Sequence, residues 1–398
     1  MNQLSQRIKE LAKAYSNDTI GIRRHIHANP ELSFEEYNTA AYVEQTLRSY
    51  GLETTRMAET GVVALIKGRN PESKTIALRA DLDALPIIEQ NQVEYKSKNE
   101  GVMHACGHDV HTASLLGAAR ILQQLHQEFE GTVKLVFQPG EEKFPGGASV
   151  MIKEGVLQQP APTGIIGQHV FPMLPAGKVG FRSGMYMASA DEIYVTVKGK
   201  GGHAALPELN VDPVLIASHL IVALQQIVSR HASPKVPTVL SFGKVEALGA
   251  TNVIPNEVKL EGTFRTMDEV WRKEAHKRIR KLAESLCESM GGSCDIDIKF
   301  GYPFLKNDPG LTGRAREAAE LYLGAENVVD LDLWMGAEDF SYYSQEVAAC
   351  FYRLGTRNEG RGIISGVHTP TFDIEESALE VGSGLMAWLA VQELQTQV

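Results

Sequence analysis

The segment MHACGHDVHT concentrates side chains that can carry out chemistry. Three histidines, a cysteine and an aspartate fall within residues 103–112. Cys106 and His108 flank a single glycine, and a thiolate together with an imidazole suits Zn²⁺ and neighbouring transition metals rather than Mg²⁺ or Ca²⁺. The alternative for this segment alone is a loop with a buried thiol and a helix-capping aspartate. We expect His104 and His111 to be bystanders, so neither is included among the candidate ligands.

More candidate donors follow the apolar runs that predict strands. These donors are Asp81 and Asp83 in RADLDALP, Glu141 and Glu142 in QPGEE, and His169 in GQHV. In open α/β sheets, ligand sites collect outside the carboxyl ends of the strands. Each residue alone would more often be structural. These three segments, together with MHACGHDVHT, make four that supply such side chains, and their common location favours a metal site.

The adjacent glutamates of QPGEE suggest a division of labour. One carboxylate can bind a metal while the other takes a proton from a water molecule and delivers it to a leaving amine, which is the arrangement that a metallohydrolase needs. An isolated Glu-Glu pair is more often a solvated acidic turn.

The elements that must position these residues alternate between strands and helices. A capping-box pattern, Ser33 followed by Glu36, predicts a helix that runs to Gly51. Further patterns predict four strands and a helix between the second and third of them: strands 61–68, 74–81, 132–139 and 163–170, and helix 110–128. This alternation predicts an α/β domain with a mixed, mostly parallel sheet flanked by helices.

The pattern changes near residue 185. From there the chain reads strand, helix, strand, strand, helix, strand, which is the βαββαβ order of the ferredoxin-like unit. A complete unit in mid-chain predicts an inserted domain. The expected boundaries are residues 1–184 and 301–398 for the first domain and 185–300 for the insertion.

Composition limits the classes of partner. The chain has 398 residues, of which 43% are hydrophobic and 22% charged, as in ordinary globular proteins. A net charge of −10 without a Lys/Arg-rich run argues against nucleic acid. The charged N-terminus does not resemble a signal peptide, and no apolar run approaches the roughly 18 residues of a membrane span. The four cysteines show no disulfide spacing. We expect a cytoplasmic protein without a nucleic-acid or membrane partner.

An ordered set of motifs gives the chain a family resemblance. The motifs are RRHIHANPELSFEE, RADLDALP, MHACGHDVHT, QPGEE, GGHAALP, TNVIPNEV, GTFR, GAEDFSYY and GVHTP. In this order the chain resembles the metal-dependent amidohydrolases of the aminoacylase/carboxypeptidase clan. It is most similar to the branch of hippurate hydrolases, N-acyl-amino-acid amidohydrolases and plant auxin-conjugate hydrolases. The motifs span about residues 20 to 375.

The resemblance implies two divalent ions per subunit in the larger, catalytic domain. Mn²⁺ or Zn²⁺ is expected, with Ni²⁺ or Co²⁺ as alternatives. Carried over by motif, the metal ligands are Cys106, His108, Glu142, His169 and His368. Many clan members have a ligand histidine where this chain has Asp81, so we leave open whether Asp81 touches metal. Asp83 is expected to orient a ligand imidazole without binding metal itself.

The resemblance also implies the catalytic and substrate-binding residues. Glu141 would be the general base and acid. His203 in GGHAALP would stabilise the oxyanion from the smaller domain, often that of the partner subunit. Asn252 and Arg265 would contact the substrate carboxylate. The inserted domain would serve for dimerisation, so we expect a homodimer, with a tetramer as the alternative.

These residues together predict a hydrolase that cleaves N-acyl amino acids, such as N-acetyl or N-benzoyl compounds, into a carboxylic acid and a free amino acid. Alternatives on the same scaffold are a dipeptidase, a carboxypeptidase or an N-acetyl-diaminopimelate deacetylase. A metal-dependent binding protein without catalysis is a further alternative. The last is a hydrolase that uses Cys106 as a nucleophile with His108.

Overall fold

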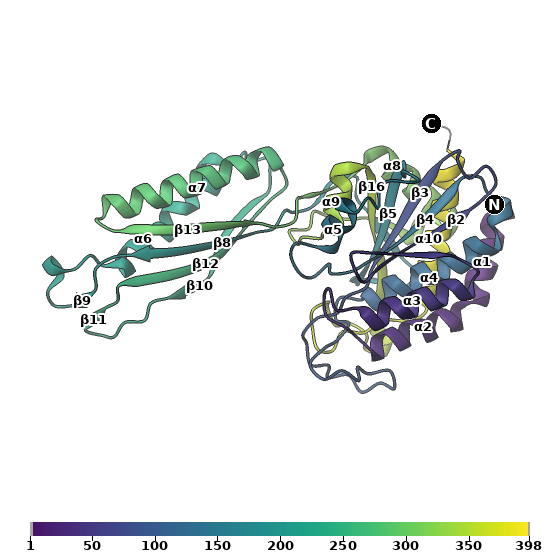
Figure 1. Ribbon diagram of the computed structural model, residues 1–398, viewed down its shortest axis with the longest axis horizontal. Coiled ribbons are helices and arrows are strands. Elements are labelled where there is room, and N and C mark those ends of the chain that lie inside the picture. The colour runs from purple at the N-terminus through teal and green to yellow at the C-terminus, as the bar shows by residue number, and fades with distance from the viewer. Residues whose placement is uncertain (1–2, 397–398) are drawn as a thin grey trace. The chain divides into compact units, whose positions relative to one another are not determined.

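Two units divide the chain (Figure 1). Unit 1 comprises Met1–Gly184, Lys306–Asp332 and Asp339–Val398, and unit 2 comprises Met185–Leu305 and Leu333–Glu338. The computed structural model describes residues 3–396. Unit 2 therefore extends beyond the predicted insertion at 185–300. One reason is that the backbone N–H groups of Gly301 and Phe304 donate to carboxylates within unit 2.

Unit 1 is built on an eight-stranded mixed sheet in the order β1-β2-β4-β3-β5-β16-β6-β15. The strands are β1 Thr54–Met57, β2 Gly61–Lys67, β3 Thr75–Asp81, β4 Thr132–Gln138, β5 Gly164–Pro175, β6 Val179–Phe181, β15 Val328–Asp330 and β16 Ala348–Arg357. The central strands β4, β3, β5 and β16 are parallel to one another, while β1, β2 and β6 introduce antiparallel pairs. Every residue of β3 and β4 is buried, as expected for parallel strands covered on both faces.

Helices cover the sheet of unit 1. They are α1 Gln3–Ala14, α2 Ser16–Ala28, α3 Tyr37–Ser49, α4 His108–Gln124, α5 Gly147–Lys153, α8 Pro309–Leu323, α9 Ser341–Glu346 and α10 Ala378–Gln395, with short 3₁₀ turns at His126–Glu128, Ala325–Asn327 and Glu359–Arg361. The helices α4 and α10 pack against each other and against β3, while α5 contacts β4 and α9 contacts β16. The N-terminus of α4 therefore lies beside the central strands.

Unit 2 contains a four-stranded antiparallel sheet in the order β10-β12-β8-β13. Its main elements are β8 Asp191–Lys198, α6 Pro213–Gln226, β10 Thr238–Glu246, β12 Glu257–Thr266, α7 Glu269–Ser289 and β13 Ser293–Phe300. This is the predicted βαββαβ order, and the predicted fold class is confirmed. Short elements accompany it: β9 Gly202–His203, β11 Val253–Ile254 and a 3₁₀ turn at Pro207–Leu209, while β7 Gly184–Met187 and β14 Leu305–Asn307 lie at the boundaries between the units.

One helix corrects the expectation about apolar runs. The helix α6 continues into a π-helical turn. By length and composition, the combined segment Pro213–His231 is long and apolar enough to cross a membrane. One side of this segment packs into the core of unit 2 through Ile216, Leu220 and Leu224. Val214, Leu215 and Val222 lie exposed elsewhere on the same helix, so the core accounts for only part of the apolar composition. No other helix among the described residues is long and apolar enough to cross a membrane.

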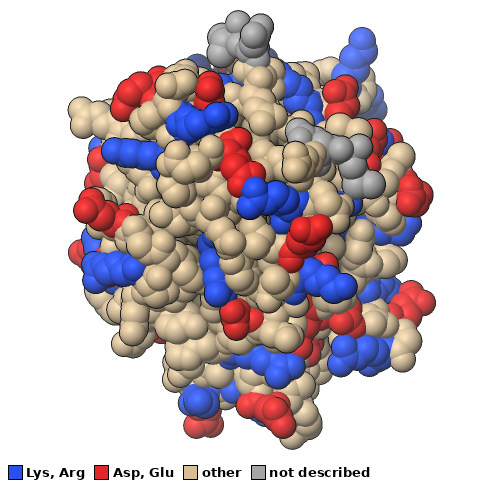
Figure 2. Space-filling view, turned by 90° about the vertical axis from the view of Figure 1, so that its right-hand side faces the viewer, with Lys and Arg blue, Asp and Glu red and all other residues tan. Residues whose placement is uncertain are grey.

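The face of unit 1 that carries the chain termini has mixed charge. Figure 2 shows Lys and Arg side chains interspersed with Asp and Glu over this face, without a broad area of one sign. Phosphate backbones require a concentrated basic patch. The face drawn in Figure 2 does not show such a patch.

Candidate metal centre

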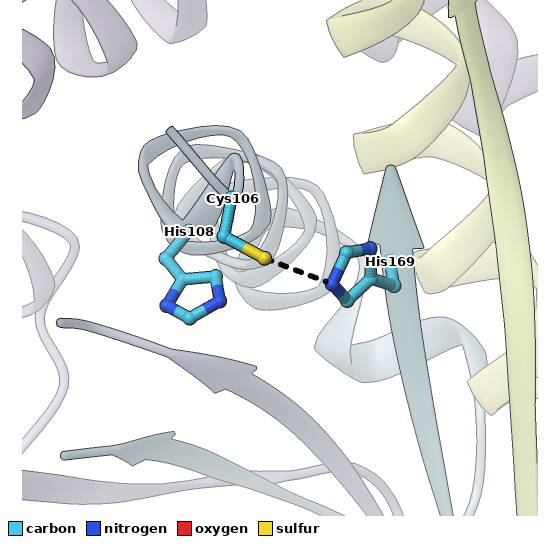
Figure 3. A group of neighbouring side chains, drawn as sticks. All are labelled: Cys106, His108 and His169. Carbon is cyan, nitrogen blue, oxygen red and sulfur yellow. Dashed lines mark hydrogen bonds between the residues drawn. The ribbon is translucent and has the colours of Figure 1, made fainter. Parts of the chain in front are cut away.

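Three buried donors converge next to the ends of β3 and β4 (Figure 3). Cys106 and His108 flank Gly107 at the start of α4, and His169 lies on β5. The Cys106 Sγ and His169 Nε2 atoms are 3.5 Å apart. Gly107 has a φ of 85°, and a Cβ at this position would lie 2.6 Å from a Val170 methyl group. Only glycine therefore allows the turn that presents Cys106 and His108 to the same site.

The other two predicted ligands reach the same thiol. His368 Nε2 lies 3.3 Å from Cys106 Sγ and 3.1 Å from Glu142 Oε1. The backbone N–H of His368 donates to the Ala105 carbonyl at 2.7 Å, which holds this loop beside the cysteine. The His368 side chain is 52% exposed, whereas Glu142 is 14% exposed. The structure thus brings all five predicted ligands together, with one side open to solvent.

The hydrogen bonds of the imidazoles leave the correct nitrogen atoms available to a metal. His169 Nδ1–H donates to the Val170 carbonyl at 2.7 Å, so Nε2 carries the lone pair on the side of Cys106. His108 Nδ1–H donates to Asp83 Oδ1 at 3.2 Å. Among residues 3–396, no hydrogen-bond partner satisfies the buried Nε2 atom of His108. A metal ion bound by thiolate, imidazole and carboxylate would satisfy that atom, so the donor set fits a metal site.

The protonation of Cys106 argues against the nucleophile alternative. Burial, followed by the negative charges of Glu142 and Glu141, raises the pKa of the Cys106 thiol well above its ordinary value. A catalytic cysteine needs a lowered pKa, because the thiolate is the nucleophile. Cys106 forms a thiolate here only when a cation compensates the charge, and this is the behaviour of a ligand.

The neighbouring His108 carries the opposite shift. Burial lowers the pKa of His108, but Asp81 and Asp83 outweigh burial and raise it to about 10. Two carboxylates therefore hold a positive charge at His108 in the absence of metal. A metal ion must displace that proton in order to bind.

The two glutamates of QPGEE point to different partners. Glu142 lies next to His368, whereas Glu141 Oε1 accepts a hydrogen bond from the backbone N–H of Asp339 at 3.4 Å. Glu141 is buried, and its Oε2 atom lies 4.0 Å from His108 Nε2. Both carboxylates lie in one donor group with His108, whose ligand atoms are within 4.8 Å of one another, but only Glu142 is paired with His368.

Asp83 connects three parts of the site. In addition to holding His108, Asp83 Oδ2 accepts hydrogen bonds from Ser33 Oγ at 2.6 Å and from the Glu142 backbone N–H at 2.9 Å. These contacts are those expected of a residue that orients a ligand imidazole. They also show that the predicted capping box is wrong, since Ser33 donates to Asp83 and the helix begins only at Tyr37.

Glu36, the second residue of the predicted capping box, holds the loop that contains Gly140, Glu141 and Glu142. Its Oε1 atom accepts hydrogen bonds from the backbone N–H groups of Phe34 and Gly140, and its Oε2 atom accepts one from Thr60. Burial, followed by the charge of Asp83, raises the pKa of Glu36 to about 7. Sequence reasoning missed this role because Ser33 and Glu36 match a local helix signal.

Asp81 is engaged by protein groups on both oxygen atoms. Oδ2 accepts from Arg79 at 2.6 Å, and Oδ1 accepts from His111 Nδ1 at 2.6 Å. Burial raises the pKa of Asp81, but Arg79, His108 and His111 together lower it well below its ordinary value. His111 is therefore a structural partner of Asp81 rather than a bystander. The alternation of Arg79 and Asp81 on one face of β3 was the signal in the sequence that could have indicated a charged environment for Asp81.

His203 and Asn252 lie together in unit 2. His203 on β9 pairs with Val253 on β11, and the Ala204 N–H donates to the Asn252 carbonyl at 3.0 Å. The Nδ1 atom of His203 accepts from the Ala205 N–H at 3.1 Å, so the proton of a neutral ring is on Nε2. Both side chains are exposed. His203 thus presents a hydrogen-bond donor to solvent.

Arg265 lies on β12 of the four-stranded sheet, whereas His203 lies in the separate two-stranded sheet of β9 and β11. Arg265 follows Glu257, the first residue of β12, by eight positions and pairs with Val239 on β10. At about 3.3 Å per residue, β12 separates Arg265 from Glu257 by about 26 Å. The Glu257 end is the one near His203, since Asn256 accepts a hydrogen bond from the Gly201 N–H. The Nε–H of Arg265 donates to Thr263 Oγ1 at 3.1 Å, and burial lowers the pKa of the Arg265 guanidinium. Within one chain, the structure does not bring Arg265 to His203 and Asn252.

A buried cluster of thiol, imidazole and carboxylate donors at the edge of an α/β sheet, with a second carboxylate beside it, defines a metal-dependent hydrolase. In each donor group, the ligand atoms lie within 4.8 Å of one another. Residues 77–392 match the sequence model of the family described as "Peptidase family M20/M25/M40". The chain belongs to this family. The expected family, enzyme class and fold are confirmed.

Similar proteins carry related names. The chain is 43% identical to the N-acyl-L-amino acid amidohydrolase of Geobacillus stearothermophilus over 77% of this chain and 82% of that protein. It is 38% identical to thermostable carboxypeptidase 2 of Saccharolobus solfataricus over 98% of each chain. The solved structure of the Bacillus subtilis YXEP protein, a dinuclear metal binding peptidase from the M20 family, superimposes with a TM-score of 0.83 at 36% identity, covering 97% of this chain and 100% of that chain.

Proposed function

We propose that the protein hydrolyses the amide bond of N-acyl amino acids to give a carboxylic acid and a free amino acid. The observation that supports this proposal is that Glu141 and Glu142 make different contacts beside a convergent donor set, Glu141 with the Asp339 N–H and Glu142 with His368. The relative at 43% identity is named for this activity, which supports the same substrate class here.

Two divalent ions, Mn²⁺ or Zn²⁺ with Ni²⁺ or Co²⁺ as alternatives, would supply Lewis acidity and lower the pKa of the attacking water. The residues that would hold them are Cys106, His108, Glu142, His169 and His368. Glu141 takes the proton from the attacking water and delivers it to the leaving nitrogen. Asp83 keeps His108 oriented through the reaction.

Unit 2 would supply the remaining contacts. The Nε2–H of His203 donates to the oxygen on which negative charge develops, while Asn252 and the planar fork of Arg265 bind the substrate carboxylate. An N-acyl amino acid is much shorter than the separation between Arg265 and His203 in one chain. We therefore propose a homodimer in which the partner subunit's His203 and the partner's Asn252 complete each site.

A carboxypeptidase or dipeptidase activity is the second candidate. It is favoured by the relative named thermostable carboxypeptidase 2, which the chain matches over nearly its whole length. The chemistry at Glu141 would be the same, because both activities break an amide bond next to a free carboxylate. The two candidates differ only in the group on the acyl side.

The decisive experiment is free-amine release from a panel of N-acetyl and N-benzoyl amino acids and dipeptides. The enzyme is assayed as purified, after exhaustive chelation, and after addition of Mn²⁺ or Zn²⁺, with bound metal measured in each sample. We expect chelation to abolish hydrolysis and a metal to restore it, with N-acyl amino acids preferred over dipeptides. Preference for dipeptides would select the second candidate. Binding of both metal and substrate without turnover would contradict hydrolysis of either class.

A further inference from the structure

A buried arginine, Arg79, is hydrogen-bonded to Asp81, which lies next to the candidate ligand His108. Arg79 on β3 donates from Nη1 to Asp81 at 2.6 Å, from Nη2 to Asp339 at 2.8 Å and from Nε to Gln138 at 2.9 Å. All four side chains are completely buried. Gln138 also donates from its amide nitrogen to Asp339 at 2.8 Å, so these groups form one connected network.

One branch of this network leads to a metal ligand. The carboxylate of Asp81 receives the Nδ1–H of His111, and the Nε2 atom of His111 accepts the Val170 backbone N–H at 2.9 Å. This arrangement requires the neutral Nδ1–H tautomer of His111, because a doubly protonated ring could not accept from Val170. Val170 follows His169 directly, and its carbonyl accepts the Nδ1–H of His169. This branch therefore holds the Val170 backbone in place. The Val170 carbonyl in turn orients the His169 ring so that its Nε2 atom faces Cys106.

The other branch leads to the proposed general base. Asp339 accepts hydrogen bonds from Arg79, from Gln138 and from the Ala148 backbone N–H at 3.0 Å. The backbone N–H of the same residue donates to Glu141 Oε1. A carboxylate held by Arg79 thus sets the position of the peptide group that contacts Glu141.

We propose that Arg79 is a positioning residue that couples the two functional ends of the site, with Asp81 and His111 aligning His169 and Asp339 aligning Glu141. This inference rests on the proposed function, since it concerns the same base and the same metal ligands. Stability alone gives little reason for such a network, because a buried ion pair is often no more stabilising than well-packed apolar residues. The two branches end instead on the two kinds of atom whose placement controls the reaction.

The branches make separable predictions. The variant His111→Phe keeps a ring but removes both nitrogen atoms, and we expect metal affinity to fall about 10- to 100-fold. In His111→Gln the amide nitrogen and oxygen reproduce the spacing of donor and acceptor, and affinity should recover most of that loss. Asp339→Asn should leave metal affinity close to that of the wild type while kcat at saturating metal falls about 10-fold and KM stays constant. Arg79→Lys should show both losses.

The experiment measures metal affinity by competition with a chromophoric chelator, and kcat and KM at saturating Mn²⁺. The matched control is Arg272→Lys, because Arg272 makes an equally buried pair with Asp191 in unit 2 at 2.9 Å. The control should lose thermal stability without losing metal affinity. The double variant Arg79→Lys/His111→Phe should bind metal no more weakly than His111→Phe alone, since both changes interrupt one branch.

Two outcomes would overturn the proposal. One is wild-type metal affinity in His111→Phe, which remains measurable even where Arg79→Lys fails to fold. The other is an Arg79→Lys enzyme that resembles the Arg272→Lys control, with reduced melting temperature but unchanged affinity and kcat. The chelator competition needs no substrate. A failure to hydrolyse N-acyl amino acids would therefore leave the affinity result intact and would count against the proposed function alone.

Discussion

The metal centre of unit 1 and the β9–β11 ribbon of unit 2 represent opposite ways of holding functional side chains. Cys106, His108 and His169 are buried, and each imidazole is fixed by a hydrogen bond on its second nitrogen. His203 is exposed on a strand of two residues, and Asn252 is exposed in the turn just before another such strand. Protein hydrogen bonds thus hold the candidate metal ligands of unit 1 in place before substrate binds. The residues proposed to contact substrate gain their low-dielectric surroundings only when substrate or a second chain covers them.

The largest expected effect breaks the chemistry of the buried region without disturbing its structure. Glu141→Gln removes the proton acceptor but keeps the shape, so we expect kcat to fall at least about 10²-fold with metal content unchanged. Steady-state kinetics and metal analysis on the same preparation test this. Glu142→Gln is the contrasting neighbour and should lose metal affinity instead. Normal turnover of a metal-loaded Glu141→Gln enzyme would remove Glu141 from the mechanism.

The exposed region should respond with a loss of turnover alone. His203→Gln removes the proposed oxyanion donor, and we expect kcat to fall about 10²-fold while metal affinity and melting temperature stay constant. His231→Gln, at another exposed histidine of unit 2, is the control and should behave like the wild type.

Mixing inactive variants sharpens the comparison further. If the partner subunit's His203 acts in each site, then Glu141→Gln and His203→Gln chains reassembled together should recover up to about one quarter of wild-type activity, because half of the dimers would contain one intact site of two. Reassembled dimers that gain nothing would place His203 in the site of its own chain.

A smaller loss is expected where a buried residue supports a ligand. Asp83→Asn weakens the acceptor for His108 Nδ1–H and for Ser33, and metal affinity should fall about 10-fold while kcat at saturating metal changes less. Ser33→Ala, which removes only one of these contacts, should show a smaller change in the same direction. Chelator competition measures both, and equal affinity in Asp83→Asn and the wild type would refute the orienting role.

Glu36→Gln is expected to have the smallest effect on turnover. Its effect should appear instead in the free energy of unfolding. The folded-state pKa of Glu36, about 7, lies above the ordinary value of 4.5, so the stability contributed by the protonated side chain is complete below about pH 4.5 and is lost as pH rises through 7. Glutamine does not titrate. The free energy of unfolding of the metal-free wild type should therefore fall relative to Glu36→Gln between pH 5 and pH 8, by at most about 3 kcal/mol. Urea unfolding at several pH values tests this, and a constant difference would contradict it.

The sequence predicts most of the buried region because strand ends of a parallel sheet meet at one edge. That rule was sufficient to expect Asp83, Glu142 and His169 near one another, and the structure places them so. It could not reveal that Ser33 donates to Asp83 rather than capping a helix, since the local pattern is the same in both cases. Tertiary partners decide between them.

Other features depended on pairings that one sequence does not display. His111 looked like one more histidine of MHACGHDVHT until Asp81 and the Val170 backbone appeared as its partners. The motif order gave no separation between Arg265 and His203, because that distance arises from the length of β12. The composition of α6 did not show that one side of the helix packs against the sheet while apolar residues elsewhere on it stay exposed.

The raised pKa of Cys106 has a consequence for the lifetime of the protein. A thiol that stays protonated is a poor target for electrophiles and peroxides, which react with the thiolate. A chain that has lost its ions should therefore resist alkylation and oxidation at this position. The thiol should therefore remain available to bind metal when ions are added back.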